Sequence, residues 1–359
     1  MVLGVNGLTG SAIAGELSGQ GWEVVGTGRD IRRFPTELAD GGVRFLRSDR
    51  HDPAQLHRVL TPGADVIVDC LCYTAEHARQ LLAHRDCFGS AVVLSSKAVY
   101  VDDQGRHSNS EDSPRFDAPV GESQSVLEPD FSGEYASREG YGPNKVAAEI
   151  TLLQSGAAVS ILRPSRIHGR RACRPREWFV VKRLLDGRRR LALAHRGRTG
   201  NHPTAAVNLA RLVASCARRP ATRVLNSADP GCPTAADVVR AIADACGCPA
   251  EIIGLDDDAP PELGWTPWNS WPPFFLDTAA SAGLGYEPAG SYAETVRPII
   301  RELCRLSVPQ RARLDEDPFF AGRFDYAVDD AALRRGPQSL VCIASETSAS
   351  VWQATARAR

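Results

Sequence analysis

Short apolar runs alternate with helix-compatible stretches through the first half of the chain. Runs of this length and composition, bounded by Gly, Asp or Ser, predict strands that are buried on both faces. Because a helical interval separates each run from the next, we expect parallel strands joined by right-handed crossovers, which form a Rossmann-type doubly wound α/β sheet. The predicted strands are Val2–Val5, Gly21–Arg29, Gly42–Arg47, Ala64–Cys72 and Ser90–Ser96.

Glycines interrupt the pattern directly after the first strand. Gly4, Gly7 and Gly10 are spaced by three and precede the helical stretch Ser11–Leu17. Glycine lets the backbone approach a pyrophosphate, and a helix N-terminus offers unpaired N–H groups to the anion. The spacing therefore predicts a dinucleotide phosphate site, although a turn needed only for tight packing would show the same glycines. The predicted phosphate contacts are Gly4, Asn6, Gly7, Leu8, Thr9 and Gly10.

The second and third strands bear on cofactor choice. In dinucleotide folds an acidic residue near the end of the second strand binds the ribose 2′-hydroxyl, but here Gly28 stands at that place and Arg29 follows it. A guanidinium pairs well with a 2′-phosphate. We therefore expect NADP(H) to be favoured and NAD(H) to be the alternative, while a solvated basic turn would look the same. Asp49 is expected to contact the adenine or to cap the helix that Pro53 opens.

Ligands of doubly wound sheets bind outside the carboxyl ends of the strands. This rule makes Cys72, Tyr73 and Ser95 further candidate cofactor contacts. From Val101 to Gly140 the pattern dissolves into Asp, Ser, Pro, Gly and Glu, which is typical of a functional lid or a mobile insert.

Helical periodicity resumes at Tyr141, with Pro143 expected in the first turn. Tyr141 and Lys145 then share one helix face. A lysine ammonium one turn away favours the phenolate, which lets a tyrosine exchange protons near neutral pH. Ser96, at the end of the neighbouring strand, could hold the substrate oxygen during that transfer.

These motifs, in this order, resemble the extended short-chain dehydrogenase/reductase superfamily of NAD(P)-dependent sugar epimerases, dehydratases and reductases. The resemblance covers roughly residues 1 to 305 and rests on 4–10, Leu94–Tyr100, Tyr141–Lys145 and Leu162–Gly169. It implies that Ser96 orients the substrate oxygen, that Tyr141 is the acid/base and that Lys145 binds the nicotinamide ribose. It also implies that Pro164 and Ser165 lie against the nicotinamide.

Departures from the family pattern narrow the range of reactions to be expected. Lys97 and Ala98 follow Ser96, where the family's nucleotide-sugar dehydratases carry an Asp-Glu pair, so dehydration is disfavoured. His168 stands where a tyrosine is usual, and Asn208 stands where an aspartate is usual. The substrate side of the site is therefore expected to differ from that of the family's common members.

The resemblance also predicts the domain organisation. Residues 1–168, joined by about 203–232, should form the dinucleotide-binding domain, and 169–305 mostly the smaller C-terminal α/β substrate domain. Arginines after Gly169 suit a nucleotide-sugar diphosphate, with a solvated helix face as the alternative. Trp178 has the helical spacing of a core residue, and a substrate contact is the alternative interpretation. The expected substrate contacts are Ser96, Tyr100, His168, Arg171, Trp178 and His202.

The C-terminal part carries two further signals. Thr234 is expected to cap a helix over Ala235–Cys246. Residues 306–359 read as an extension, in which the aromatic residues of Asp315–Phe320 and Arg323–Tyr326 are expected to fold back onto the body. The Ser/Thr/Ala-rich end from Pro337 reads as a poorly ordered tail or a dimer-contacting arm.

Composition excludes several classes of protein. A net charge near −1 gives no reason to expect nucleic acid or an anionic membrane as partner. No apolar run approaches the ~20 residues of a membrane span, and no signal peptide precedes the first strand, so we expect a cytoplasmic protein. The ten cysteines lack C-x-x-C spacing, which favours free thiols over disulfides or a metal site. The resemblance implies a homodimer.

Together these observations predict an oxidoreductase that moves a hydride between nicotinamide and a carbinol or carbonyl carbon of a sugar or sugar-like small molecule, either free or nucleotide-linked. An epimerase that retains its NAD(P) is the first alternative. A non-catalytic, cofactor-sensing or RNA-binding member of the fold is the second, and the Ser96, Tyr141 and Lys145 set argues against it.

Overall fold

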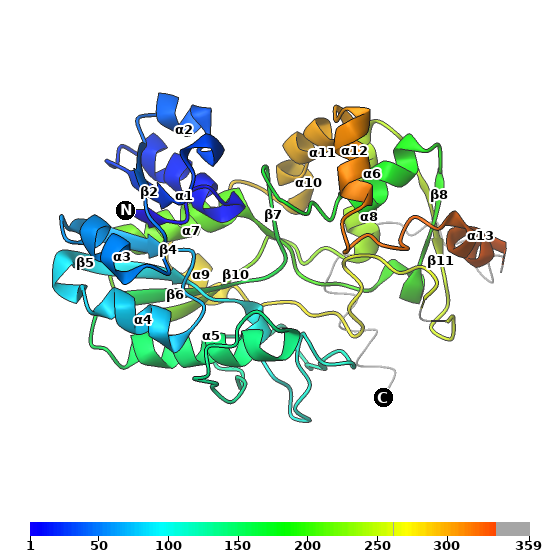
Figure 1. Cartoon of the computed structure of the whole chain (residues 1–359). Coiled ribbons are helices and arrows are strands. Elements are labelled where there is room, and N and C mark those ends of the chain that lie inside the picture. Colours follow the sequence, from blue (N-terminus) through cyan, green and yellow to red (C-terminus); the bar gives the residue numbers. More distant parts are fainter. Residues whose placement is uncertain (261, 335–359) are drawn as a thin grey trace.

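The computed structural model describes residues 1–260 and 262–334 and consists of two units that lie side by side (Figure 1). The larger unit is built on a seven-stranded sheet of order β10-β6-β5-β4-β1-β2-β3, in which all neighbours are parallel. This confirms the predicted Rossmann-type fold. Its strands are β1 (Val2–Leu3), β2 (Val25–Gly28), β3 (Arg44–Arg47), β4 (Ala64–Asp69), β5 (Phe88–Leu94), β6 (Val159–Pro164) and β10 (Arg223–Ser227).

The direction of the winding reverses at β1. From β1 the chain moves outward through β2 and β3, and it then returns to the other side of β1 for β4, β5 and β6. Ligands of such sheets bind in the crevice at this reversal, outside the carboxyl ends of the strands. The glycine turn of residues 4–10 follows β1 and therefore stands at that crevice.

Helices cover both faces of the sheet because its strands alternate apolar side chains between them. Val66 and Val68 of β4 contribute to one core, whereas Ile67 contributes to the other. Each such fully buried side chain stabilises the fold by about 1.5–3 kcal/mol. One face carries α1 (Leu8–Gly19), α2 (Thr36–Asp40) and α7 (Ala206–Arg218), and the other carries α3 (Pro53–Leu60), α4 (Ala75–Leu82) and α5 (Arg138–Leu153).

The smaller unit surrounds a second core that includes Trp178, Val239, Ile300 and Phe320. Its helix α8 begins at the predicted residue, where Thr234 forms a capping box with Asp237. The elements of this unit are α6 (Trp178–Leu185), α8 (Ala235–Cys246), α10 (Tyr292–Thr295), α11 (Arg297–Cys304) and the parallel pair β8 (Arg190–Leu193) and β11 (Glu251–Gly254).

Short elements complete the chain. The pair β7 (Ile167–His168) and β9 (Thr204–Ala205) connects the two units, and α9 (Ala279–Ala282) packs beside β10. The 3-10 helices are η1 (Ile31–Arg33), η2 (Arg85–Cys87), η3 (Lys97–Val99) and η4 (Ala194–Gly197). Among residues 1–260 and 262–334, no helix combines the length and apolar character needed to cross a membrane.

The C-terminal extension packs on the smaller unit through α12 (Val308–Asp315) and α13 (Tyr326–Arg334). Phe320 is buried in the second core, and the indole Nε1 of Trp178 donates to Asp315 at 2.8 Å. The prediction that this segment folds back through its aromatic residues is confirmed. The predicted tail from Pro337 lies outside the described residues.

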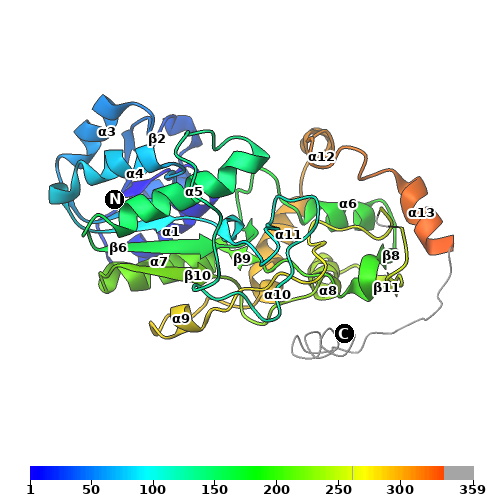
Figure 2. The same ribbon diagram turned by 90° about the horizontal axis from the view of Figure 1, so that it is seen from below.

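The long segment before α5 is irregular but anchored; it lies beneath α5 in Figure 1 and therefore in front of the other elements in Figure 2, which is seen from below. The carboxylate of Asp102 accepts backbone N–H groups of Gln104, Arg106 and Arg115, and these bonds together with the Arg106 guanidinium outweigh burial and lower its pKa to about 2. Val120 forms a β-bridge with Leu276.

Helix α5 begins earlier than predicted. Ser137 is its N-cap and accepts the N–H of Gly140, so Pro143 lies inside the helix rather than in its first turn. A proline there removes the hydrogen bond to the carbonyl four residues earlier. That carbonyl belongs to Glu139, which is exposed and can be solvated.

Candidate active site

The glycine turn between β1 and α1 forms an open backbone cradle. The N–H groups of Gly4 and Val5 donate to the carbonyl of Thr27 on β2, which fixes the turn against the sheet. Gly4 has a φ of 93°, a conformation that favours glycine. A Cβ atom on Gly10 would overlap the carbonyl group of Gly4, whereas one on Gly7 would meet nothing closer than 3.5 Å. Gly10 thus serves packing, and Gly7 borders open space.

The N-terminus of α1 supplies the polar side of this cradle. Gly7 is its N-cap, and no side chain caps the first turn, which contains Leu8, Thr9 and Gly10. Their N–H groups therefore point outward without a capping acceptor, as at an anion site. The cradle fits the pyrophosphate of a dinucleotide.

A cavity of about 600 Å³ extends from the glycine turn along the ends of β2, β3 and β4. Asn6 closes one edge, where its side-chain amide donates to the carbonyl of Asp30 at 2.8 Å. Arg29 and Arg33 line the cavity as the sequence predicts for Arg29, but Asp30 lines it too. The Asp30 carboxylate is held by Arg32 at 2.9 Å, whose hydrogen bonds lower the pKa of Asp30.

Asp49 lines the same cavity but does not cap the following helix. Its carboxylate accepts the N–H of His51 at 3.0 Å. The N-cap of α3 is Asp52, which accepts the N–H groups of Ala54 and Gln55. The capping alternative for Asp49 was wrong because Asp52, directly before Pro53, occupies the N-cap position.

Two stacked tyrosines form the far wall of the cavity. The rings of Tyr73 and Tyr135 lie 4.9 Å apart at an angle of 6°. Tyr135 comes from the long segment before α5, so this segment reaches the cavity. Burial, followed by the neighbouring Tyr141, raises the pKa of Tyr73 to about 12, and Tyr73 therefore keeps its proton at neutral pH.

Tyr141 and Lys145 of α5 lie next to this wall. The Nζ of Lys145 donates to the carbonyls of Cys72 at 2.7 Å and Leu94 at 2.9 Å, so one buried ammonium ties together the ends of β4 and β5. It lies 4.3 Å from the ring centre of Tyr73 and 5.9 Å from that of Tyr141. The structure thus brings together the predicted Tyr141, Lys145, Cys72 and Tyr73.

The two serines after β5 have different surroundings. The Ser96 Oγ accepts the N–H of Ala98 at 3.2 Å and so caps η3, which leaves its hydroxyl hydrogen without an acceptor among the described residues. The Ser95 hydroxyl instead donates to Glu149 inside the protein. Its hydroxyl is therefore paired inside the core. The expectation that Ser95 contacts the cofactor is corrected, because only the backbone of Ser95 is left for such a contact.

Glu149 is a site residue that the sequence analysis missed. It lies one turn after Lys145 on α5 and forms a buried ion pair with Arg163 of β6, with 2.5 Å between Nη2 and Oε2. Pro164 and Ser165 follow Arg163 and are buried at the end of β6. Glu149 lies four residues after Lys145 and so on the same helix face, and this spacing was the sequence signal that could have indicated it.

A family model described as "NAD dependent epimerase/dehydratase family" matches residues 1–200. The chain belongs to this family. It is therefore an enzyme of the short-chain dehydrogenase/reductase type, as the order of its motifs predicted. A comparison with curated proteins finds no match.

Solved structures with the same fold agree with this assignment. A UDP-glucose 4-epimerase from Thermotoga maritima has a TM-score of 0.61 at 14% identity, over 84% of this chain and 96% of that one. A UDP-N-acetylglucosamine 4-epimerase from Bacillus cereus has a TM-score of 0.62 at 16% identity, over 85% and 96%. A dTDP-glucose 4,6-dehydratase from Bacillus anthracis, in complex with NAD, has a TM-score of 0.60 at 14% identity, over 84% and 94%.

Three of the expected substrate contacts of this family member are buried structural residues. Tyr100 is fully buried, with its hydroxyl donating to Asn226 at 2.7 Å. Trp178 lies in the second core. The ring of His202 bonds the carbonyl of Asp229 at 2.7 Å and the N–H of Leu276 at 3.1 Å. All three expectations are corrected because each polar atom already has a partner inside the protein.

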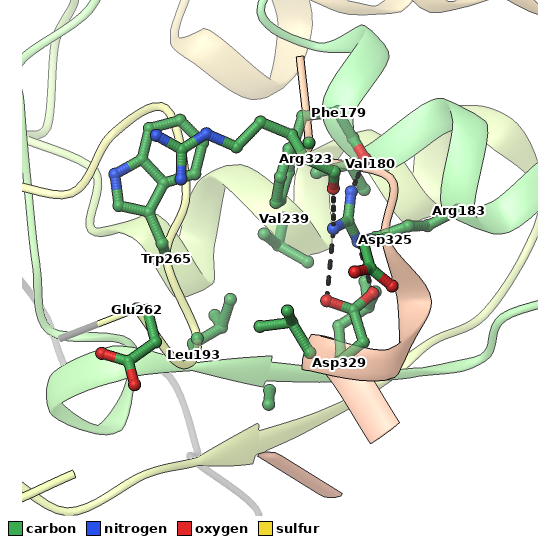
Figure 3. Close-up of a pocket in the computed structure, with 15 residues that line it drawn as sticks. Phe179, Val180, Arg183, Leu193, Val239, Glu262, Trp265, Arg323, Asp325 and Asp329 are labelled. Carbon is green, nitrogen blue, oxygen red and sulfur yellow. Dashed lines mark hydrogen bonds and ion pairs between the residues drawn. The ribbon is translucent and has the colours of Figure 1, made fainter. Parts of the chain in front are cut away.

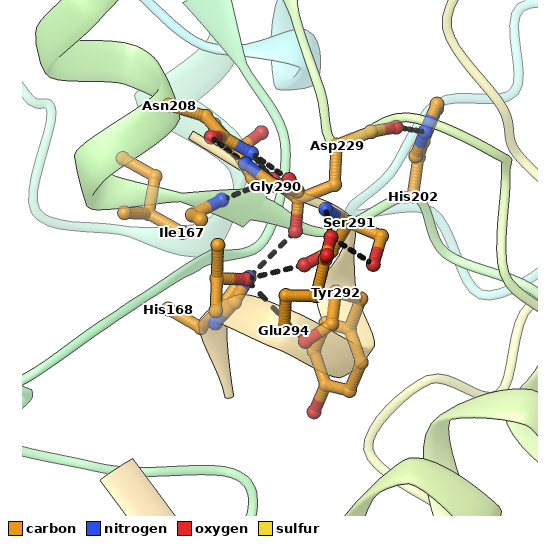
Figure 4. Close-up of polar contacts among 12 residues, drawn as sticks. Ile167, His168, His202, Asn208, Asp229, Gly290, Ser291, Tyr292 and Glu294 are labelled. Carbon is orange, nitrogen blue, oxygen red and sulfur yellow. Dashed lines mark hydrogen bonds and ion pairs between the residues drawn. The ribbon is translucent and has the colours of Figure 1, made fainter. Parts of the chain in front are cut away.

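His168 and Arg171 occupy the junction between the units. The Nε2 of His168 lies 2.7 Å from the buried carboxylate of Asp229, which also accepts the N–H of Ala205 and the amide of Asn208 (Figure 4). Asp229 organises this cluster, and it belongs to no motif that the sequence analysis could have used to find it. Arg171 is exposed and donates to the carbonyl of Arg33 at 3.1 Å, which links the segment after β7 to the edge of the cavity at the glycine turn.

A separate cavity of about 250 Å³ lies in the smaller unit, between α6, β8 and the C-terminal extension (Figure 3). Arg323 stacks on Trp265 at 3.8 Å on one side, and Arg183 pairs with Asp329 on the other. It shares no lining residue with the cavity at the glycine turn. The Arg183 guanidinium also donates to the backbone carbonyl of Arg323 at 2.7 Å.

Proposed function

We propose that this protein transfers a hydride between nicotinamide and a carbinol or carbonyl carbon of a sugar or sugar-like substrate. The observation that carries the proposal is the meeting of two independent features at one edge of the sheet. The glycine cradle follows β1, and Lys145 binds the ends of β4 and β5 with Tyr141 one turn before it on α5.

The proposed roles follow from the contacts. Tyr141 would give or take the proton of the substrate oxygen, and Ser96 would hold that oxygen with its unpaired hydroxyl hydrogen. The Lys145 ammonium, 5.9 Å from the Tyr141 ring centre, stabilises negative charge that develops on the reacting oxygens. The bound nicotinamide supplies or accepts the hydride. The protein orients the two reactants and holds the proton.

A tyrosine variant tests the proposal. Tyr141→Phe should lower turnover of NAD(P)H-dependent sugar reduction or oxidation by about 10²–10⁴-fold and leave dinucleotide affinity unchanged. The assay follows the absorbance of reduced nicotinamide with a panel of free and nucleotide-linked sugars. Tyr135→Phe is the matched control, because it keeps the stacked ring and should remain active. Full activity of Tyr141→Phe would disprove the assigned role.

Epimerisation is the second candidate, and the fold similarity to two solved sugar-nucleotide 4-epimerases favours it. An epimerase returns the hydride to the same carbon and needs no external cofactor turnover. Net reduction would consume NAD(P)H steadily, whereas epimerisation would interconvert two sugars without a net change in nicotinamide absorbance. The same sugar panel, analysed for product stereochemistry, separates the two reactions.

Preference for NADP(H) over NAD(H) is part of the proposal. Arg29 and Arg33 line the cavity at the end of β2, and the Asp30 carboxylate there is already paired with Arg32. A 2′-phosphate would find two guanidinium groups and a neutralised acid. We expect Arg29→Ala to weaken NADPH binding by about tenfold and NADH binding little. Equal losses for both dinucleotides would count against the preference.

A further inference from the structure

Most arginines after Gly169 are neutralised within the protein. Several of the arginines that suggested a diphosphate site in the sequence have a carboxylate at ion-pair distance. The pairs are Arg170 with Glu302, Arg174 with Asp317, Arg183 with Asp329, Arg188 with Asp330 and Arg190 with Glu251. An anion that binds this protein would have to displace those carboxylates or find other cations.

Lys97, Arg166 and Arg176, here called the cation cluster, form no ion pair with any described residue. Lys97 is 5% exposed, with Nζ donating to Asn201 and lying 3.8 Å from the ring centre of Phe274. The Nε atoms of Arg166 and Arg176 are buried without a hydrogen-bond partner. The backbone of Arg166 has a φ of 38°, a strained conformation of the kind that gathers at ligand sites.

The fold brings the cation cluster together at the carboxyl ends of β5 and β6. Lys97 directly follows Ser96, and its Nζ donates to Asn201. Thr204 lies three residues after Asn201, and its N–H donates to the carbonyl of Arg166. Arg176 donates to the carbonyl of Ile167, the residue after Arg166.

The three charges influence one another. Burial first, and then the charges of Arg166 and Arg176, lower the pKa of Lys97 well below its ordinary value. Burial and the charge of Arg176 lower the pKa of Arg166 to about 10. Glu177 is the nearby carboxylate, and its charge opposes the lowering of the Arg176 pKa that burial causes. It forms no ion pair with a residue that the structure describes, and it accepts the hydroxyl of Tyr292 at 3.4 Å. The cluster therefore gathers three basic side chains, and no carboxylate of the described residues lies at ion-pair distance from them.

We infer that Lys97, Arg166 and Arg176 bind an anionic group of the substrate, a carboxylate or a phosphoryl group, next to Ser96. The inference rests on the proposed function, whose substrate class it narrows to acidic sugars or sugar phosphates. Buried cations without a counter-charge are costly, and an anion with several oxygens removes that cost. Arginine suits such a group because its fork binds two oxygens at once.

Binding of simple anions to the full-length protein tests the inference. Saturating dinucleotide first occupies the glycine cradle, and calorimetry then measures inorganic pyrophosphate, glucuronate and glucose. We expect at least one of the two anions to bind the wild type. The affinity for glucose, which has no charge, should be the same for the wild type and for a variant that lacks the cation cluster. Binding of pyrophosphate alone assigns a phosphoryl group, and binding of glucuronate alone assigns a carboxylate.

Variants identify the site. Arg166→Gln combined with Arg176→Gln should weaken anion binding by about tenfold or more. Arg174→Gln is the matched control, because Arg174 is 52% exposed and already paired with Asp317, and it should bind as the wild type does. Lys97→Met should weaken binding in the same direction as the double variant.

Thermal stability separates a binding role from a structural one. Removing two unpaired buried charges should leave the thermal midpoint unchanged or raise it, whereas removing structural partners would lower it. A wild type that binds neither anion, or a double variant that binds both as tightly, overturns the inference. Dinucleotide binding, measured in the same series, shows independently whether the proposed function stands.

Discussion

Replacing Glu149 by glutamine should destabilise the protein strongly, because it leaves a buried guanidinium without its counter-charge. The side chains of Glu149 and Arg163 are 4% and 6% exposed. Burial alone would lower the pKa of Arg163, but the hydrogen bonds and charge of Glu149 outweigh it and raise that pKa. Breaking one partner of such a buried pair costs about 3–5 kcal/mol of unfolding free energy.

Urea unfolding of the full chain, followed by circular dichroism, measures this loss. Glu251→Gln is the matched control, because the Arg190–Glu251 pair is 50% and 47% exposed and should contribute about 0–1 kcal/mol. The double variant Glu149→Leu/Arg163→Met removes both charges and should recover most of the lost stability. A Glu149→Gln protein within about 1 kcal/mol of wild type would refute the reasoning.

Two further predictions follow from packing and protonation. Gly10→Ala should cost about 1–3 kcal/mol because its Cβ overlaps the Gly4 carbonyl, whereas Gly7→Ala should unfold like wild type and lose dinucleotide affinity, as titration of each variant would show. Burial lowers the pKa of His202 to about 4 from an ordinary 6.5, so folding keeps it neutral and stability is lost as pH falls from 6.5 towards 4. The loss at pH 5 should be about 2 kcal/mol, and His202→Gln should reduce it in urea titrations; an unchanged pH dependence would contradict this.

The sheet could be predicted from the sequence because buried parallel strands are short, apolar and separated by helical intervals. The bounds of α8 could be predicted because Thr234 and Gly247 mark its ends locally. Both features depend on residues close together in the chain. The family assignment succeeded for a related reason, since its motifs are local and occur in a fixed order.

Partners far apart in sequence could not be predicted in this way. Ser95 and Ser96 are adjacent, yet successive residues near a strand end point in opposite directions, and only the structure shows that Ser95 meets Glu149. Tyr100 and His202 stand near motifs but find Asn226 and Asp229 inside the protein. That Arg166 and Arg176 lack an ion pair with any described residue, whereas Arg170 and Arg174 have one, is likewise visible only in the structure.

The last strand of the sheet, β10, joins it only after the chain has begun the smaller unit. A fragment cut at residue 168 would lose both β10 and α7, which packs on α1. The backbone of β6 would then be an unpaired sheet edge, and the apolar side of α1 would be exposed to water. Both features promote self-association. The same two surfaces are exposed during synthesis on the ribosome, because α7 and β10 are made later. The larger unit can therefore complete its fold only after residues beyond 220 have been synthesised.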